Sequence, residues 1–157
     1  MKRCFFIGHR ETGEEVLPLL QQEVERHVIE YGVDAFVVGN YGGFDRMAAK
    51  AVAEAKERYP HITLSLLLPY HPAERKVLLP APFDDSFYPE GLETVPRRFA
   101  IVQANRRMIG CSDYLIAYVW HPASNAQKII AYAQRQAQRR EITEHRENRE
   151  NATERIF

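Results

Sequence analysis

Four short apolar runs, separated by stretches with helical periodicity, constrain this chain most. The runs cover residues 4–7, 35–38, 62–68 and 114–120. Strands that are apolar throughout, without polar alternation, are typical of parallel sheets buried on both faces. The stretch after the first run places Leu17, Leu20 and Val24 on one helical stripe. Buried strands alternating with amphipathic helices predict an α/β protein of three layers with a mostly parallel sheet.

The alternation of apolar runs and helical stretches does not extend to the end of the chain. Residues 1–140 carry it and are expected to form one domain, whereas residues 141–157 form a charged C-terminal tail in which Ile142 is the main apolar anchor. Such a tail has little apolar surface whose burial could offset its ordering entropy. We expect either a helical extension or a disordered end that the fold does not need.

Residues 70–95 interrupt the alternation of strands and helices. The segment is longer than an ordinary connection, so we expect it to carry a function or an edge element, with a short strand within residues 83–88. Residues 70–91 are also too apolar for a free loop, which is one of two grounds for predicting a homodimer. The apolar residues in question are Val77, Leu78, Leu79, Phe83 and Phe87.

Charge and cysteine content narrow the classes of partner and compartment. The 21 basic and 21 acidic residues cancel, which argues against nucleic acid or an anionic membrane as the main partner. No apolar run approaches the roughly 20 residues of a membrane span, and residues 8–11 interrupt the apolar N-terminal run before it could serve as a signal peptide. Cys4 and Cys111 lack ligand spacing and are interpreted as small buried residues of a reduced, cytoplasmic protein.

Polar and glycine residues follow all four predicted strands, at residues 8–10, 39–46, 69–72 and 121–125. Ligands of open parallel sheets bind beyond the carboxyl ends of the strands, so these segments predict a binding site. The candidate ligand-binding residues, two of them from the helix before the last strand, are Gly8, His9, Arg10, Gly39, Gly42, Gly43, Asp45, Arg106, Arg107, His121, Ser124 and Asn125.

Several of these candidates have two interpretations. Gly42 and Gly43 either let backbone N–H groups approach a phosphate at a helix N-terminus, or form a tight turn that needs a positive φ. Asp45 either accepts a hydrogen bond from a ribose hydroxyl or stabilises the helix dipole. Ser124 either caps the last helix or binds phosphate, and the two roles are compatible.

The basic candidate residues also have two interpretations each. Arg106 and Arg107 are either solvated or aimed at a phosphate from the sheet edge, and the same two interpretations hold for His9 and Arg10. No set of His, Asp and Glu residues has metal-ligand spacing, so neither a metal nor another cofactor is expected.

Taken in order, the strand ends resemble those of YpsA-like proteins of the SLOG superfamily. Residues 5–10 (FFIGHR) are similar to the opening TGHR of these proteins, and residues 39–48 (GNYGGFDRMA) are similar to their GGxxD…A turn. Residues 105–109 and 112–117 are similar to their NRxMI..SDxLIA pattern, and Asn125 lies in the loop that follows it. The resemblance covers residues 4–137 and implies a Rossmann-like sheet whose strand ends bind a nucleotide or a nucleotide-derived ligand. It also implies pairing through helices flanking the sheet, which is the other ground for predicting a homodimer.

The superfamily is similar to the Lonely Guy phosphoribohydrolases and to the Rossmann-like domain of DNA-processing protein A. Lonely Guy enzymes hydrolyse the N-glycosidic bond of a nucleoside monophosphate, using an Arg before the last strand and a Glu in PGGxGTxxE after it. Arg106 or Arg107 could supply that Arg, but Ile129 stands at the position of the Glu. A carboxylate there would stabilise an oxocarbenium-like transition state and activate water, so its replacement argues against the same mechanism.

The leading hypothesis is a cytoplasmic domain that binds a nucleotide or phosphorylated nucleoside, as a sensor or in nucleotide metabolism. The alternative is a nucleoside monophosphate phosphoribohydrolase, with Asp45 and Arg106 as candidate catalytic residues. A DNA-associated accessory protein is a further alternative that the neutral charge disfavours.

Overall fold

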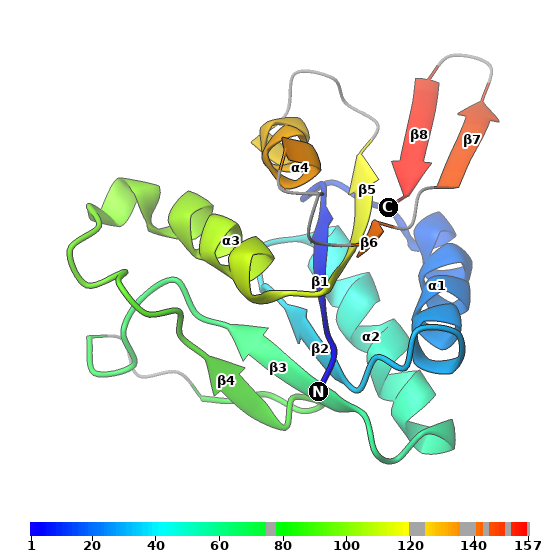
Figure 1. Cartoon of the computed structure of the whole chain (residues 1–157), viewed down its shortest axis with the longest axis horizontal. Coiled ribbons are helices and arrows are strands. Elements are labelled where there is room, and N and C mark those ends of the chain that lie inside the picture. Colours follow the sequence, from blue (N-terminus) through cyan, green and yellow to red (C-terminus); the bar gives the residue numbers. More distant parts are fainter. Residues whose placement is uncertain (75–77, 120–124, 136–140, 143–144, 150–151, 157) are drawn as a thin grey trace.

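The computed structural model describes residues 1–74, 78–119, 125–135, 141–142, 145–149 and 152–156 (Figure 1). Its elements, in chain order, are β1 (Arg3–Gly8), a 3₁₀ turn η1 (Glu14–Val16), α1 (Leu17–Ile29), β2 (Ala35–Val38), α2 (Gly43–Arg58), β3 (Thr63–Leu67), β4 (Asp85–Phe87), a 3₁₀ turn η2 (Arg97–Phe99), α3 (Ala100–Cys111), β5 (Tyr114–Val119), α4 (Asn125–Arg135), β6 (Glu141–Ile142), β7 (His145–Arg149) and β8 (Ala152–Ile156).

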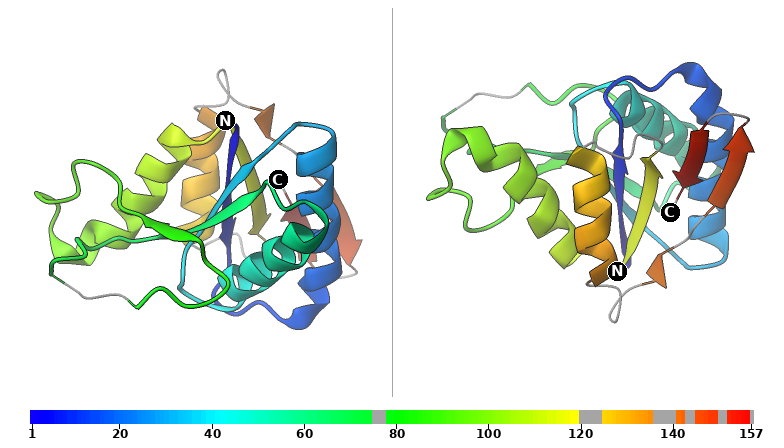
Figure 2. Two further views of the ribbon diagram at one scale, coloured as in Figure 1. Left: turned by 90° about the horizontal axis from the view of Figure 1, so that it is seen from below. Right: turned by 90° about the horizontal axis from the view of Figure 1, so that it is seen from above.

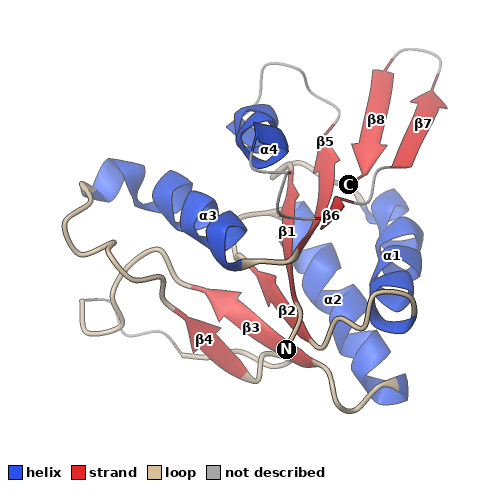
Figure 3. Ribbon diagram, in the orientation of Figure 1, coloured by secondary structure: helices blue, strands red, loops and turns tan. Residues whose placement is uncertain are grey.

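The central sheet has the strand order β4-β3-β2-β1-β5, and all of these strands pair in parallel (Figure 3). β1 lies between β2 and β5, and its Phe5 pairs with Val37 on one side and Leu115 on the other. The predicted α/β class with a mostly parallel sheet is therefore confirmed.

Alternation along each strand produces two separate cores. Successive side chains of a strand point to opposite faces, so Cys4 and Phe6 pack under α1 and α2, whereas Phe5 and Ile7 pack under α3 and α4. All four side chains are buried. This double burial explains why the strands read as continuous apolar runs in the sequence.

The helices cover the two faces in pairs. α1 and α2 lie on one side of the sheet, and α3 and α4 lie on the other, as the views in Figures 1 and 2 agree. The chain builds β1 to β4 outward in one direction and then crosses back over the sheet through α3 to place β5 beside β1. The connections that leave β1 and β5 therefore run to opposite faces, and this reversal of strand order is where open α/β sheets form a ligand crevice.

The first helix and the edge element of the long segment are both present. The first helix begins at Leu17, which places Pro18 in its first turn, where a missing N–H costs no helical hydrogen bond. The short strand expected within residues 83–88 is β4. β4 pairs with β3 through Leu66 and Ser86, so the long segment returns to the sheet edge before η2 begins.

The C-terminal tail differs from both expectations, a helical extension and a disordered end. β6 pairs in parallel with the start of β5, and β8 pairs antiparallel with its end, where Tyr118 faces Ile156. β7 completes a hairpin with β8. The physical reason is the open edge of β5: β1 occupies one side only, and the backbone groups on the other side gain hydrogen-bond partners from the tail.

Two further expectations have mixed outcomes. Cys4 is buried as expected, but Cys111 is exposed, so the interpretation of both cysteines as core residues is wrong for the second. In the long segment Leu78 is 90% exposed and Leu79 40% exposed, while Phe83 and Phe87 pack against the two cores. The homodimer stays a prediction.

Among the described residues, no helix combines the length and apolar character that crossing a membrane requires.

Candidate functional site

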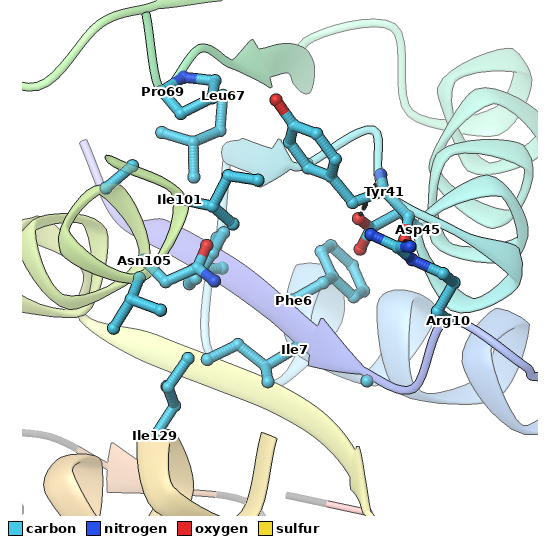
Figure 4. Close-up of a pocket in the computed structure, with 15 residues that line it drawn as sticks. Phe6, Ile7, Arg10, Tyr41, Asp45, Leu67, Pro69, Ile101, Asn105 and Ile129 are labelled. Carbon is cyan, nitrogen blue, oxygen red and sulfur yellow. Dashed lines mark hydrogen bonds between the residues drawn. The ribbon is translucent and has the colours of Figure 1, made fainter. Parts of the chain in front are cut away.

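A cavity of about 200 Å³ opens at the carboxyl ends of β1, β2 and β3, next to α3 and α4 (Figure 4). Residues 5–8 of β1 line its base, Gly39 follows β2, and Leu67 ends β3. The cavity thus lies at the crevice that the reversal of strand order creates.

Asp45 provides the carboxylate of the cavity. It lies in the first turn of α2, is half-buried, and its Oδ2 accepts a hydrogen bond from the backbone N–H of Tyr41 at 3.0 Å. Burial raises the pKa of Asp45 to about 6, and the hydrogen bond from Tyr41 offsets part of that rise. A perturbed carboxyl in a cavity is typical of functional sites.

Arg10 provides the positive charge on the same side. Its exposed side chain donates a hydrogen bond from Nε to the carbonyl oxygen of Tyr41 at 3.2 Å. The backbone of Tyr41 therefore bonds both charged side chains, through its N–H to Asp45 and through its C=O to Arg10. Figure 4 shows the three residues gathered on one side of the cavity.

The opposite wall is apolar apart from one amide. α3 contributes Ile101 and, one turn later, the half-buried Asn105, and α4 contributes Ile129, which is 5% exposed (Figure 4). Ile129, the residue that stands at the position of the hydrolases' Glu, therefore lies on the cavity wall.

Backbone N–H groups at the Gly42–Gly43 turn already have hydrogen-bond acceptors within the chain. Gly42 has a φ of +145°, which favours glycine, as the tight-turn interpretation expects. The N–H of Gly43 donates to the carbonyl of Arg10 at 2.7 Å, and the N–H of Phe44 donates to the carbonyl of His9 at 3.4 Å. Two donors at the start of α2 are thus already bonded to the loop after β1.

The predicted site residues divide into three groups. Gly8, Arg10, Gly39 and Asp45 come together around the cavity. His9, Gly42 and Gly43 lie beside the cavity, in the adjoining turn. The two arginines of α3 have other neighbours: the Arg106 guanidinium lies 5.5 Å from the ring centroid of Tyr132, and Arg107 lies against Gly91. Asn125 begins α4, while His121 and Ser124 lie outside the described residues.

Sequence reasoning missed two polar residues of the cavity, Tyr41 and Asn105. Tyr41 lies inside a strand end that the sequence marks, but the groups by which it bonds Asp45 and Arg10 are its backbone N–H and C=O, which carry no residue signature. Asn105 has a weak signal: it follows Ile101 by four residues, so it shares that residue's face of α3.

The geometry defines an α/β protein with a ligand cavity at the carboxyl edge of an open parallel sheet. Its cavity offers a cation, a carboxylate, an amide and an apolar wall. Among the side chains that the structure describes, no three His, Cys, Asp or Glu groups gather as a metal-binding set. Comparison of the sequence with protein-family models and with curated proteins gave no match.

Replacing Gly43 by Ala should destabilise the protein by about 1–3 kcal/mol, because the added Cβ would lie 2.3 Å from the backbone oxygen of Thr12. Gly110→Ala is the matched control: its Cβ would meet no atom within 4 Å, and the helix α3 should gain about 0.5–1 kcal/mol. Urea unfolding measures both. Unchanged stability in Gly43→Ala would mean that the loop after β1 does not pack firmly on α2.

Asp45→Asn should stabilise the protein above pH 6 but not near pH 3. The folded protein holds the Asp45 proton more tightly than the unfolded chain does, since the pKa rises from 3.8 to about 6. The stability linked to that proton is present below pH 4 and is lost as the pH rises to 6. Urea unfolding of both proteins should show a difference that grows over this range to at most about 3 kcal/mol. A difference that stays constant with pH would contradict the assignment.

Proposed function

We propose that this chain binds a nucleotide or a phosphorylated nucleoside in the cavity at the carboxyl ends of β1, β2 and β3. The observation that carries the proposal is the convergence of Arg10 and Asp45 on a cavity at the reversal of strand order. A ligand with an anionic group, hydroxyl groups and a flat apolar part matches this combination of cation, carboxylate and apolar wall.

The polar groups suggest how such a ligand lies. The Arg10 guanidinium is exposed and has N–H donors beyond the one bonded to Tyr41, so it is the group we assign to the phosphate. The N–H groups of Gly43 and Phe44 are engaged by carbonyls, which leaves the side chain of Arg10 as the stronger candidate. The Asp45 carboxylate repels phosphate but accepts hydrogen bonds from ribose hydroxyls.

The resemblance to YpsA-like SLOG proteins supports the same ligand class. Three of the segments that carry it contribute to the cavity: residues 5–10 through Gly8 and Arg10, residues 39–48 through Gly39 and Asp45, and residues 105–109 through Asn105. Within that class we propose a role as a nucleotide sensor or in nucleotide metabolism.

A phosphoribohydrolase is the second candidate, and one observation favours it. The pKa of Asp45, raised by burial to about 6, is close to the value that suits a general acid or base near neutral pH. Against it stands Ile129, an apolar side chain on the cavity wall at the position of the Glu in the enzymes that the sequence resembles. We therefore favour a binding protein over a hydrolase.

Isothermal titration of the purified chain with nucleoside monophosphates should show binding. Arg10→Gln should weaken it about tenfold, because a charge-assisted bond to phosphate is lost. Arg135→Gln is the control, since this exposed residue lies in the last turn of α4, beyond the cavity-lining Ile129. Equal losses in both variants would assign the effect to overall charge, and absence of binding to the wild type would refute the proposal.

Incubation with the same nucleotides should release little or no free base. A positioned acid or base contributes about 10²–10⁴-fold to such a rate, and Ile129 cannot supply it. Chromatography of the mixture measures the base. Release well above background that disappears in Asp45→Asn would overturn the binding-only proposal and make Asp45 the catalytic carboxylate.

A further inference from the structure

A second hollow, of about 520 Å³, lies beside the cavity, between the segment after β3 and the start of α3. Pro69 lines both spaces. A third hollow, of about 290 Å³, shares Tyr41 and Leu67 with the cavity and Tyr70 with the second hollow. The three spaces therefore adjoin one another near the ends of β2 and β3, and we refer to them together as the groove.

The cavity alone is small for the proposed ligand. Sites for small molecules usually enclose about 300–1,000 Å³, and the cavity encloses about 200 Å³. A bound nucleotide would therefore extend into the groove, where the second hollow, of about 520 Å³, offers more space than the third, of about 290 Å³.

Flat side chains line the second hollow. The rings of His71 and Tyr88 are in edge-to-face contact, with centroids 5.2 Å apart, and the Arg97 guanidinium lies 5.2 Å from the ring centroid of Tyr70. Aromatic and guanidinium planes of this kind are the groups on which proteins stack unpaired nucleobases.

The charge of the hollow differs from that of the Arg10 side of the cavity. Glu74 and Glu93 line it together with Arg97, whose guanidinium lies over Tyr70, so carboxylates outnumber cations there. Burial and the two carboxylates raise the pKa of Tyr88. Carboxylates repel a phosphate, and they accept hydrogen bonds from N–H groups such as the exocyclic amine of adenine or cytosine. The groove therefore favours one orientation, with the phosphate at Arg10 and the base at the far end.

Building on the proposed function, we propose that this second hollow is the base subsite, which stacks the nucleobase against Tyr88 and His71. Glu74 and Glu93 accept hydrogen bonds from the amino group of the base. An exocyclic amine presents two N–H donors to the carboxylates, whereas the oxo group at the same position of hypoxanthine or uracil is an acceptor that carboxylates repel. The subsite thereby favours amino-bearing bases, which are adenine, cytosine and guanine, over hypoxanthine and uracil.

The first experiment compares AMP with ribose 5-phosphate, which has the sugar and phosphate but no base. Isothermal titration of Tyr88→Leu should show about tenfold weaker binding of AMP, because a stacking partner is lost, and unchanged binding of ribose 5-phosphate. Tyr59→Leu, at the opposite end of α2 from the cavity, is the matched control and should bind both as the wild type does. His71→Ala removes an exposed ring, so it tests stacking even if Tyr88→Leu fails to fold.

The second experiment tests the selection of the base. The wild type should bind AMP about tenfold more tightly than IMP, since a hydrogen bond to a charged acceptor contributes about that much. The double variant Glu74→Gln with Glu93→Gln should lose most of this preference. An equal preference in the double variant and the wild type would overturn the assignment of the two carboxylates.

The outcomes separate this inference from the proposed function. If the wild type binds neither AMP nor ribose 5-phosphate, the proposed function fails, and the base subsite fails with it. If the wild type binds AMP and both Tyr88→Leu and His71→Ala bind it equally well, the base subsite is refuted while nucleotide binding stands.

Discussion

The structure depends on the burial of β1 on both of its faces and both of its edges. β1 pairs with β2 and β5, contributes Phe6 to the core under α1 and α2, and contributes Phe5 to the core under α3 and α4. Because β1 ends at Gly8, where its neighbours β2 and β5 connect to opposite faces, the same strand that holds the two cores together also positions the cavity. Fold and site therefore share one central element.

Backbone hydrogen bonds, more than side-chain packing, set the charged side of the cavity. The carbonyls of His9 and Arg10, in the loop after β1, accept the first N–H groups of α2. Tyr41 then bonds Asp45 and Arg10 through its own backbone. These bonds hold both charged side chains beside the cavity, where burial raises the pKa of Asp45.

The sequence pattern predicted the helices and strands of residues 1–140 but not the strands of the tail. Continuous apolar runs predicted the buried strands, and the strand ends predicted Arg10, Gly39 and Asp45 as neighbours, because parallel strands bring their carboxyl ends to one edge. The tail was misjudged because strand pairing at an open edge depends on backbone groups, and these leave little trace in a charged sequence such as residues 145–149.

The sequence by itself therefore determined the layer architecture and one side of the candidate site, since both follow from periodicity and from strand direction. Only the tertiary structure decided which helix faces meet the cavity. Asn105 and Ile129 line the wall of the cavity, and Arg106 lies over the ring of Tyr132. The N–H groups of Gly43 and Phe44 bond to carbonyls of the loop after β1. The physical reason is that the contacts of a helix depend on its rotation and on the elements packed against it, which involve residues far away in the chain.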